Sequence, residues 1–236
     1  MTNRPARALV LSGLLVALGL TGCANLIPPS ATPVPPAASQ LTTAPPPASL
    51  GKVEINNYKG KRLDAVNSEP ENSIKGPQHV DIKSYRLTVT GLVKTPQSLT
   101  YDQVLALPAF QKVTKLNCVE GWSVTYLWQG VLLKDVLAKA GYDPHADVAI
   151  FRCYDGYSTS LPLDFLVNRN IMLAYRMNGV VMPPERGYPF QLVAENQLGY
   201  KWAKWVTSIE VSNDTNFRGY WESRGYDNSA TIPGTK

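Results

Sequence analysis

The sequence has few of the residues that most often bind metal ions or carry out acid–base chemistry. Its 236 residues include three cysteines and two histidines, His79 and His145. It has no Gly-rich nucleotide loop, no Cys-x-x-Cys pair and no His-Glu-x-x-His sequence. These absences disfavour a zinc site, and both histidines are interpreted as ordinary surface or core residues. Spacing alone leaves a Cys/His protease pair open, although neither histidine has a supporting motif.

The apolar run at residues 9–20 is too short for a membrane-spanning helix, which takes about 20 apolar residues. Arg4 and Arg7 precede the run, which gives it the layout of an export signal. The run ends in Leu-Thr-Gly-Cys at residues 20–23, which resembles a bacterial lipobox and implies cleavage before Cys23 and acylation of that cysteine. A plain signal peptide with an incidental cysteine is the alternative. We therefore expect a lipoprotein signal peptide at residues 1–22 and a membrane-anchored protein outside the cytosol, either periplasmic or on the cell surface.

Composition divides the rest of the chain into two parts. Residues 23–50 are dominated by Pro, Ala, Ser and Thr, which cannot bury enough apolar surface to offset chain entropy, so this part is predicted to be a disordered linker. Residues 51–236 are long enough for one domain with a core, and no repeat interrupts them. The net charge of +5 comes from scattered Lys and Arg residues. Because an exported protein is not expected to bind nucleic acid, this excess suits a phosphate-bearing cofactor, an anionic substrate or a membrane surface.

Local patterns within the domain predict both helices and strands. Helices are expected at residues 99–107, capped by Thr100, and at residues 131–140, ended by Gly141. The predicted strands are residues 84–90, 148–151, 190–194 and 205–211. Because strands outnumber helices, we expect an α+β domain with mixed, mostly antiparallel sheets and flanking helices.

One cysteine of the domain stands in an unusual setting. Leu-Asn-Cys-Val-Glu-Gly-Trp at residues 116–122 places Cys118 among polar and aromatic residues. In an oxidising compartment a thiol is expected to be bridged, bound to a metal or used in chemistry. We favour metal ligation, with a disulfide between Cys118 and Cys153 as the alternative.

Several segments resemble the molybdopterin-binding domain of the sulfite oxidase family. They are Cys-Val-Glu-Gly-Trp at 118–122, Trp-Gln-Gly-Val-Leu-Leu at 128–133, Asp-Gly-Tyr-Ser-Thr-Ser-Leu-Pro-Leu at 155–163, and a closing set at 178–179, 186–193 and 199–205. The similarity is strongest to the branch that includes the periplasmic catalytic subunit of the methionine sulfoxide reductase system. It implies a single domain with the sulfite oxidase-type molybdopterin-binding fold, a mononuclear molybdenum–molybdopterin cofactor and oxidoreductase activity.

The resemblance also implies roles for individual residues. Cys118 would supply a thiolate to molybdenum, which keeps that thiol deprotonated. Glu120 would influence solvent or protons beside the metal, and Tyr157 would face the substrate. Lys201 and Lys204 would hold the cofactor phosphate through charge-assisted hydrogen bonds, with a basic strand edge as the alternative. The expected cofactor-binding residues are Asn72, Cys118, Cys153, Arg186, Gln191, Lys201, Trp202, Ala203 and Lys204.

Some of these positions depart from the family pattern or have a second explanation. Cys153 stands where the related reductase has a threonine, and it is either a pocket-lining thiol or a buried small hydrophobe. Arg186 and Gln191 stand where many relatives have a histidine or asparagine and an arginine, so the cofactor contacts are expected to be rearranged. A turn explains Asn72 equally well.

The function implied by the resemblance is transfer of an oxygen atom and two electrons between the metal and a small oxo compound. A sulfoxide is expected rather than sulfite, because the arginine-rich pocket of the sulfite oxidases is not seen. Because the chain carries no second redox centre, we expect a haem- or quinone-linked redox partner, membrane-bound or soluble, and a monomer. The competing hypothesis is a non-catalytic lipoprotein binding domain that kept the fold and lost the cofactor. The departures at Cys153, Arg186 and Gln191 favour that hypothesis, whereas the presence of Cys118 and Lys204 opposes it.

Overall fold

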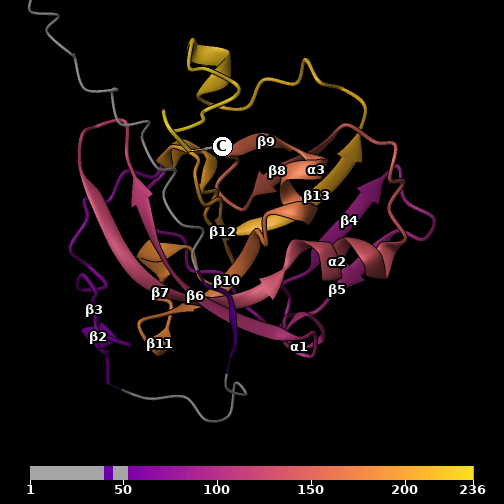
Figure 1. Ribbon diagram of the computed structural model, residues 1–236. Coiled ribbons are helices and arrows are strands. Elements are labelled where there is room, and N and C mark those ends of the chain that lie inside the picture. The colour runs from indigo at the N-terminus through magenta and orange to yellow at the C-terminus, as the bar shows by residue number, and fades with distance from the viewer. Residues whose placement is uncertain (1–39, 45–52, 236) are drawn as a thin grey trace, which may run out of the picture. The chain divides into compact units, whose positions relative to one another are not determined.

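Two β-sheets form most of the structure, a computed structural model that describes residues 40–44 and 53–235 (Figure 1). The predicted signal peptide, Cys23 and most of the predicted linker lie outside the described residues. In the first sheet the strand order is β1-β6-β7-β10-β11, with β12 also pairing with β10, and every pair is antiparallel. The strands of this sheet are β1 (Thr42–Thr43), β6 (Ala109–Asn117), β7 (Ser123–Leu132), β10 (Met172–Met177), β11 (Val180–Val181) and β12 (Gln191–Val193).

The second sheet is mixed. Its order is β5-β4-β13-β8-β9, in which the β4–β13 pair is parallel and the other pairs are antiparallel. Its strands are β4 (Leu87–Gly91), β5 (Gln97–Leu99), β8 (Val148–Cys153), β9 (Ser158–Pro162) and β13 (Val206–Ser212), and a separate small hairpin joins β2 (Asn57–Tyr58) to β3 (Lys61–Arg62). The predicted mixed α+β architecture is therefore confirmed.

Short helices connect and flank these strands. The α-helices are α1 (Tyr101–Leu105), α2 (Leu133–Ala140) and α3 (Leu163–Asn168), and the 3₁₀ turns are η2 (Pro184–Arg186), η3 (Gly199–Lys201) and η4 (Glu222–Arg224). None of the helices in the described part is both long and apolar enough to cross a membrane.

The predicted signals for helix ends are confirmed in α1 and α2. The Thr100 side chain accepts the Gln103 N–H while the Gln103 side chain accepts the Thr100 N–H, which is a capping box. Gly141 ends α2 in the left-handed conformation, with φ of 62°. Val131 and Leu132, which were predicted to begin this helix, are instead the last residues of β7.

The sequence patterns did not reveal the longest hairpin, β6–β7, or strand β10. The two strands of the hairpin pair from Ala109 opposite Val131 to Asn117 opposite Ser123, and the tight turn between them is residues 118–122. β7 pairs on its other edge with β10, so it is an internal strand of the sheet. The hairpin therefore fixes the position of the turn that carries Cys118.

Part of the segment predicted to be a disordered linker is a strand. Thr42 and Thr43 pair with Gln111 and Phe110 at the free edge of β6. The Ala44 N–H also donates to the Ala109 carbonyl at 2.9 Å. Backbone pairing to a sheet edge needs no apolar side chains, which is why composition did not indicate it.

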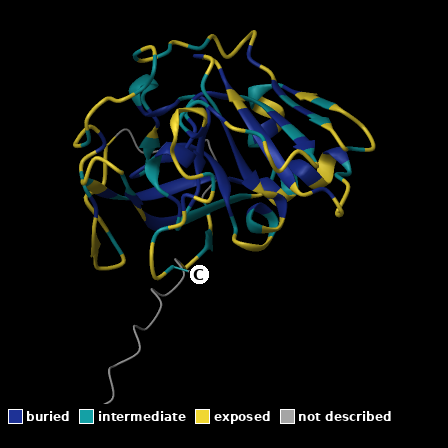
Figure 2. Ribbon diagram, turned by 90° about the horizontal axis from the view of Figure 1, so that it is seen from above, coloured by how far each residue is buried: buried dark blue, intermediate teal, exposed yellow. Residues whose placement is uncertain are grey.

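A single large apolar cluster joins the two sheets to α2. It includes Val89 of β4, Val131 of β7, Val136 of α2 and Leu173 of β10, all with no exposed surface. In Figure 2 the buried residues fill the centre of the domain, and the exposed residues lie mainly on peripheral loops. The loops that form the candidate site are therefore held by a well-packed core.

Gly130 permits the close approach of β7 and β10, so Gly130→Ala should destabilise the domain. A Cβ at this position would lie 2.0 Å from the Leu173 carbonyl oxygen and 2.6 Å from Ala174 Cα, both backbone atoms. We expect a loss of about 1–3 kcal/mol or more in the free energy of unfolding, measured by denaturant titration. Ser123→Ala, at an exposed position of the same strand, is the control. Equal stability of the two variants would contradict this packing argument.

Candidate active site

Cys118 lies in the turn of the β6–β7 hairpin. Its N–H donates to the Trp122 carbonyl at 2.9 Å, and its carbonyl accepts the Gly121 N–H at 3.2 Å. Gly121 has φ of +90°, which a residue with a side chain rarely adopts. The turn thus holds the cysteine in one place by backbone bonds alone.

Polar groups from the turn and from a distant loop surround the Cys118 sulfur. Its Sγ lies 3.4 Å from Glu120 Oε2 and 4.0 Å from the Asn72 amide nitrogen. The Trp122 indole N–H donates to the same Glu120 oxygen at 2.8 Å. This hydrogen bond, followed by that from Cys118, lowers the pKa of Glu120, whereas partial burial raises the pKa of the Cys118 thiol. Asn72 is therefore a neighbour of the sulfur as well as a loop residue.

Both cysteines of the described residues are free thiols. Cys118 is partly exposed and Cys153 is buried, so the alternative of a disulfide between them is not formed. Cys153 belongs to the apolar core and does not line the pocket. This position agrees with the interpretation as a buried small hydrophobe and does not support a contact with the cofactor.

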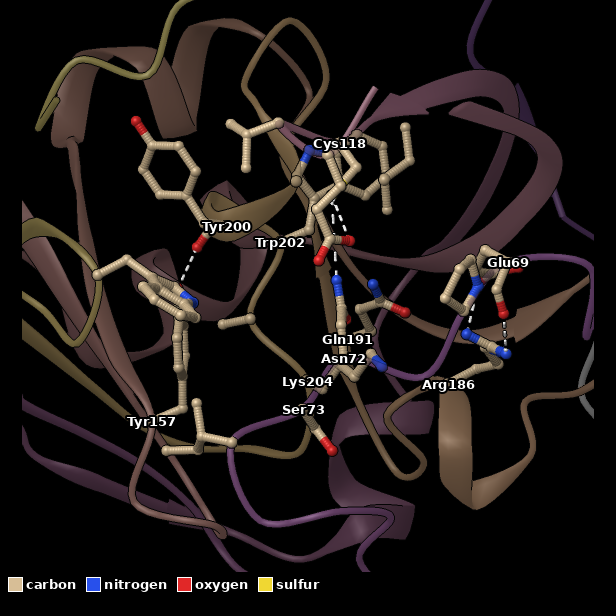
Figure 3. Close-up of a pocket in the computed structure, with 18 of the residues that line it drawn as sticks. Glu69, Asn72, Ser73, Cys118, Tyr157, Arg186, Gln191, Tyr200, Trp202 and Lys204 are labelled. Carbon is tan, nitrogen blue, oxygen red and sulfur yellow. Dashed lines mark hydrogen bonds and ion pairs between the residues drawn. The ribbon is translucent and has the colours of Figure 1, made fainter. Parts of the chain in front are cut away.

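A pocket opens beside Cys118 and brings together segments that are far apart in the sequence (Figure 3). They are the loop at residues 69–74, the hairpin turn, the β8–β9 turn, η2, β12 and η3, together with part of the C-terminal segment. The predicted residues that line it are Asn72, Cys118, Glu120, Tyr157, Arg186, Gln191, Trp202, Ala203 and Lys204.

Each of the two cations in the pocket lining is paired with a glutamate. Arg186 Nη1 lies 3.1 Å from Glu69 Oε1, and its Nη2 donates to the Glu69 backbone carbonyl at 2.8 Å. Lys204 Nζ lies 3.3 Å from Glu71 Oε2. Burial lowers the pKa of Lys204, and the charge of Glu71 opposes that shift. Both glutamates belong to the loop that also carries Asn72, so this loop supplies negative charge to the pocket.

Lys201 does not line the pocket, so the structure does not support the predicted contact with the cofactor phosphate. Its side chain has no exposed surface, and its Nζ lies 2.5 Å from Glu222 Oε1, which is equally buried. The amine also donates to the Ser160 carbonyl at 3.0 Å and to Asn228 Oδ1 at 3.2 Å. With its donors directed into the protein, Lys201 connects η3 to the C-terminal segment.

Tyr157 lines the pocket with its ring, but its hydroxyl group is already used. The hydroxyl donates to the backbone carbonyl of Tyr200, as Figure 3 shows. Burial raises the pKa of this phenol well above its ordinary range. Tyr157 can therefore shape the pocket beside a substrate, but its geometry does not suit it to donate a proton.

Trp202, Ala203 and Gln191 form one buried side of the pocket. The Trp202 indole donates to the Gln197 carbonyl at 3.0 Å, and the Ala203 carbonyl accepts the Leu192 N–H at 2.8 Å. The second of these bonds connects β12 to the segment that follows η3. The side chain of Gln191 has 3% exposure.

Sequence reasoning missed several residues of the pocket. The hydroxyl of Ser73 is buried, close to the Glu71 carboxylate. Asp155 is buried, which raises its pKa, and its carboxylate accepts the Tyr157 N–H at 2.9 Å. Ser73 directly follows Asn72, and Asp155 lies two residues before Tyr157. Closeness in sequence to these two predicted residues was the signal that could have revealed them. The remaining missed residues include Glu69, Tyr200, Trp221 and Tyr226.

The donors in the pocket suit the molybdenum cofactor that the resemblance implies. A free thiol faces the pocket, as a soft metal requires. The Ser73 hydroxyl, which lines the pocket, can hydrogen-bond to a polar ligand, and the Lys204 ammonium can bind an anionic group. The residues present therefore fit the group.

Comparisons with known proteins agree with this arrangement. The oxidoreductase molybdopterin binding domain family matches residues 74–221. An uncharacterized oxidoreductase, YuiH of Bacillus subtilis, is 36% identical over 151 residues, which are 64% of this chain and 76% of that protein.

Two further relatives have names that concern methionine sulfoxide reductases. The putative protein-methionine-sulfoxide reductase subunit YedZ1 of Azospira oryzae is 36% identical over 64% of this chain and 57% of its own length. The catalytic subunit MsrP of Gluconobacter oxydans is 30% identical over 54% of this chain and 46% of its own length. This chain thus matches about half the length of these two relatives.

A solved structure supports the fold. The sulfane dehydrogenase SoxCD of Paracoccus pantotrophus superposes with a TM-score of 0.56 at 24% identity, over 59% of this chain and 41% of that chain. Together with the family match and the free thiol in the pocket, it leads to one conclusion: the chain belongs to the oxidoreductase molybdopterin binding domain family and is a molybdenum-cofactor oxidoreductase.

Proposed function

We propose that the protein reduces a small sulfoxide outside the cytosol, on a molybdenum centre held by Cys118. The observation that carries this proposal is the free Cys118 thiol in the pocket, fixed by its turn and flanked by Asn72 and Glu120. When bound, the cofactor supplies oxygen-atom and two-electron transfer chemistry. Reduction of a sulfoxide breaks its sulfur–oxygen bond, takes up two electrons and two protons, and releases a sulfide and water.

The chain's own residues bind and orient the reacting groups. Cys118 provides the thiolate ligand, and the Asn72 amide lies where it can hydrogen-bond to that sulfur. Glu120, which is exposed and hydrogen-bonded to the Trp122 indole, is placed to exchange protons with solvent beside the metal. Lys204 would bind the phosphate of the cofactor in exchange for part of its contact with Glu71.

The charge of the pocket supports a neutral oxo substrate. Arg186 and Lys204 are both paired with glutamates, and Glu120 and Asp155 add acidic groups to the lining. An anion such as sulfite would have to compete with these carboxylates for the two cations, whereas a sulfoxide would not. The names of two relatives, which refer to methionine sulfoxide reductases, point to the same class of substrate.

We further propose that the domain is a monomer tethered to a membrane through acylated Cys23 and supplied with electrons by a haem- or quinone-linked partner. The lipobox-like sequence at residues 20–23 supports the anchor. The need for two electrons per turnover supports the partner. Thr42 and Thr43 of β1 are paired with the edge of β6. In this proposal the tether is therefore the part of the chain between Cys23 and Thr42.

Cys118→Ala should abolish sulfoxide reduction while leaving the fold intact. Cys118 is partly exposed at a turn, so its loss removes a ligand and little packing. Turnover with a reduced dye as electron donor and the thermal midpoint should be measured on the same samples. Cys153→Ala is the matched control: it removes a buried thiol from the core and should lower stability more than turnover. Full molybdenum-dependent turnover of Cys118→Ala would show that the thiolate assignment is wrong.

Lys204→Glu should lower cofactor affinity by at least about tenfold. The substitution removes a charge-assisted contact worth about 1.5–3 kcal/mol and places a second carboxylate beside Glu71. A tenfold change in affinity corresponds to about 1.4 kcal/mol, so the loss of the contact alone is enough for the expected effect. Molybdenum and pterin per chain should be measured after purification and dilution. Lys115→Glu, at an exposed position of β6, makes the same charge change outside the pocket and should keep the wild-type content. Equal contents in Lys204→Glu and wild type would rule out phosphate binding by Lys204.

Cys23→Ser should release the protein from membranes into the soluble fraction. The reason is that a single acyl chain gives only marginal binding, so a stable anchor depends on the several chains of a lipoprotein cysteine. Fractionation of cells expressing the full chain, with cofactor content as a check on folding, provides the measurement. Membrane association that survives the substitution would contradict the proposed anchor.

A further inference from the structure

The segment after β13 returns across the domain to the pocket, although no motif in this segment predicted a role for it. In Figure 1 this segment, drawn in yellow, passes beyond the end of β13 and reaches η4 near β9. The Tyr220 N–H donates to the Ser158 carbonyl of β9 at 2.9 Å. Farther along, the Ala230 carbonyl accepts the Leu198 N–H at 2.8 Å, just before η3. The segment is thus attached on both sides of η4.

A buried ion pair fixes the middle of this segment. Glu222, the first residue of η4, lies 2.5 Å from Lys201 Nζ, and neither side chain has exposed surface. The Thr159 hydroxyl donates to the same Glu222 oxygen at 2.5 Å. Because an unpaired charge in a buried site is costly, this pair strongly favours one position of η4. The residue directly before Glu222 is Trp221, which lines the pocket.

Trp221 forms an aromatic wall together with Tyr200 and Tyr226, and we call these three residues the C-terminal wall. The ring centroids of Trp221 and Tyr226 are 5.1 Å apart, and those of Tyr200 and Tyr226 are 5.3 Å apart. The Tyr200 hydroxyl donates to the Asp227 carbonyl at 2.6 Å, so it is directed to the backbone. All three residues line the same pocket as Cys118. Tyr226 keeps 38% of its surface exposed, which shows that part of the wall faces solvent.

We propose that the C-terminal wall is the substrate-specificity element of the pocket and that it binds the apolar substituent of a neutral oxo substrate while the oxo group faces the site of Cys118. This inference rests on the proposed function and names the substrate class for that site. Aromatic faces attract other rings and polarisable sulfur groups, and they cannot stabilise an anion. Arg186 and Lys204, the two cations of the lining, are paired with Glu69 and Glu71. They therefore do not reverse the preference of the wall for neutral substrates over anions. The wall therefore selects aryl or thioether-like sulfoxides over small hydrated ones.

The test compares binding of methyl phenyl sulfoxide and dimethyl sulfoxide to the cofactor-loaded protein. Binding of methyl phenyl sulfoxide is measured by calorimetry, and dimethyl sulfoxide is added as a competitor. Tyr226→Ala should weaken binding of the phenyl compound by about tenfold. The affinity for dimethyl sulfoxide, obtained from the competition, should change less than about threefold. Trp221→Leu, which keeps apolar bulk but removes the ring, should act in the same direction. Tyr154→Ala is the control, because Tyr154 is 57% exposed and does not line the pocket.

Kinetics with a reduced dye then separate this inference from the proposed function. For the phenyl compound, the wall variants should raise KM and leave kcat largely unchanged. If the wild-type protein binds methyl phenyl sulfoxide through the wall but reduces no sulfoxide, the wall is supported and the proposed function fails. If both sulfoxides are reduced but the wall variants bind and turn over the phenyl compound like wild type, the wall inference is overturned and the proposed function stands. Absence of phenyl sulfoxide binding to the wild-type protein also overturns it.

Discussion

The backbone pairing of the β6–β7 hairpin is the constraint on which the site depends. β7 is bonded to β6 from Ser123 to Val131 and to β10 from Trp128 to Leu132, so the strand cannot shift without breaking two ladders. The turn at its end therefore presents Cys118 at a fixed point on the rim of the core. The other components of the pocket are mostly loops and 3₁₀ turns, and the loop at residues 69–74 reaches the Cys118 sulfur through Asn72. A side chain on a rigid hairpin keeps its position with little help from its neighbours, which suits the proposed role of Cys118 as the single protein sulfur bound to the metal.

Three ion pairs, two of them buried, connect the loops around that point. Glu69 pairs with Arg186, Glu71 with Lys204 and Glu222 with Lys201. The first two pairs connect the loop at residues 69–74 to η2, which contains Arg186, and to the segment after η3, which contains Lys204. The third connects η3 to the C-terminal segment. Such pairs add little net stability when they are buried, because the cost of removing both charges from water offsets much of their attraction. Here the first two pairs engage both cations of the pocket lining, and all three fix which segments face each other.

Elements with local signals could be predicted from the sequence, and elements defined by distant partners could not. The capping box at Thr100 and the terminating Gly141 are local, and both helix ends were predicted correctly. β6 has no regular alternation of burial and contains the fully buried Lys112, which pairs with Glu195 at 3.0 Å, so its sequence looks too polar for an internal strand. Cys118 was recognised because its motif is local. Lys201 and Lys204 look equivalent in sequence. Only the folded chain shows that Lys201 forms a buried ion pair with Glu222.

The central claim is that Cys118 is the protein's sulfur ligand to molybdenum, and X-ray absorption at the molybdenum edge tests it most directly. The number of sulfur atoms around the metal should be determined for the purified, cofactor-loaded protein and for Cys118→Ala loaded in the same way. The account predicts that the variant has one sulfur ligand fewer than the wild type, with the sulfurs of the pterin retained. An identical sulfur count in the two proteins would contradict it.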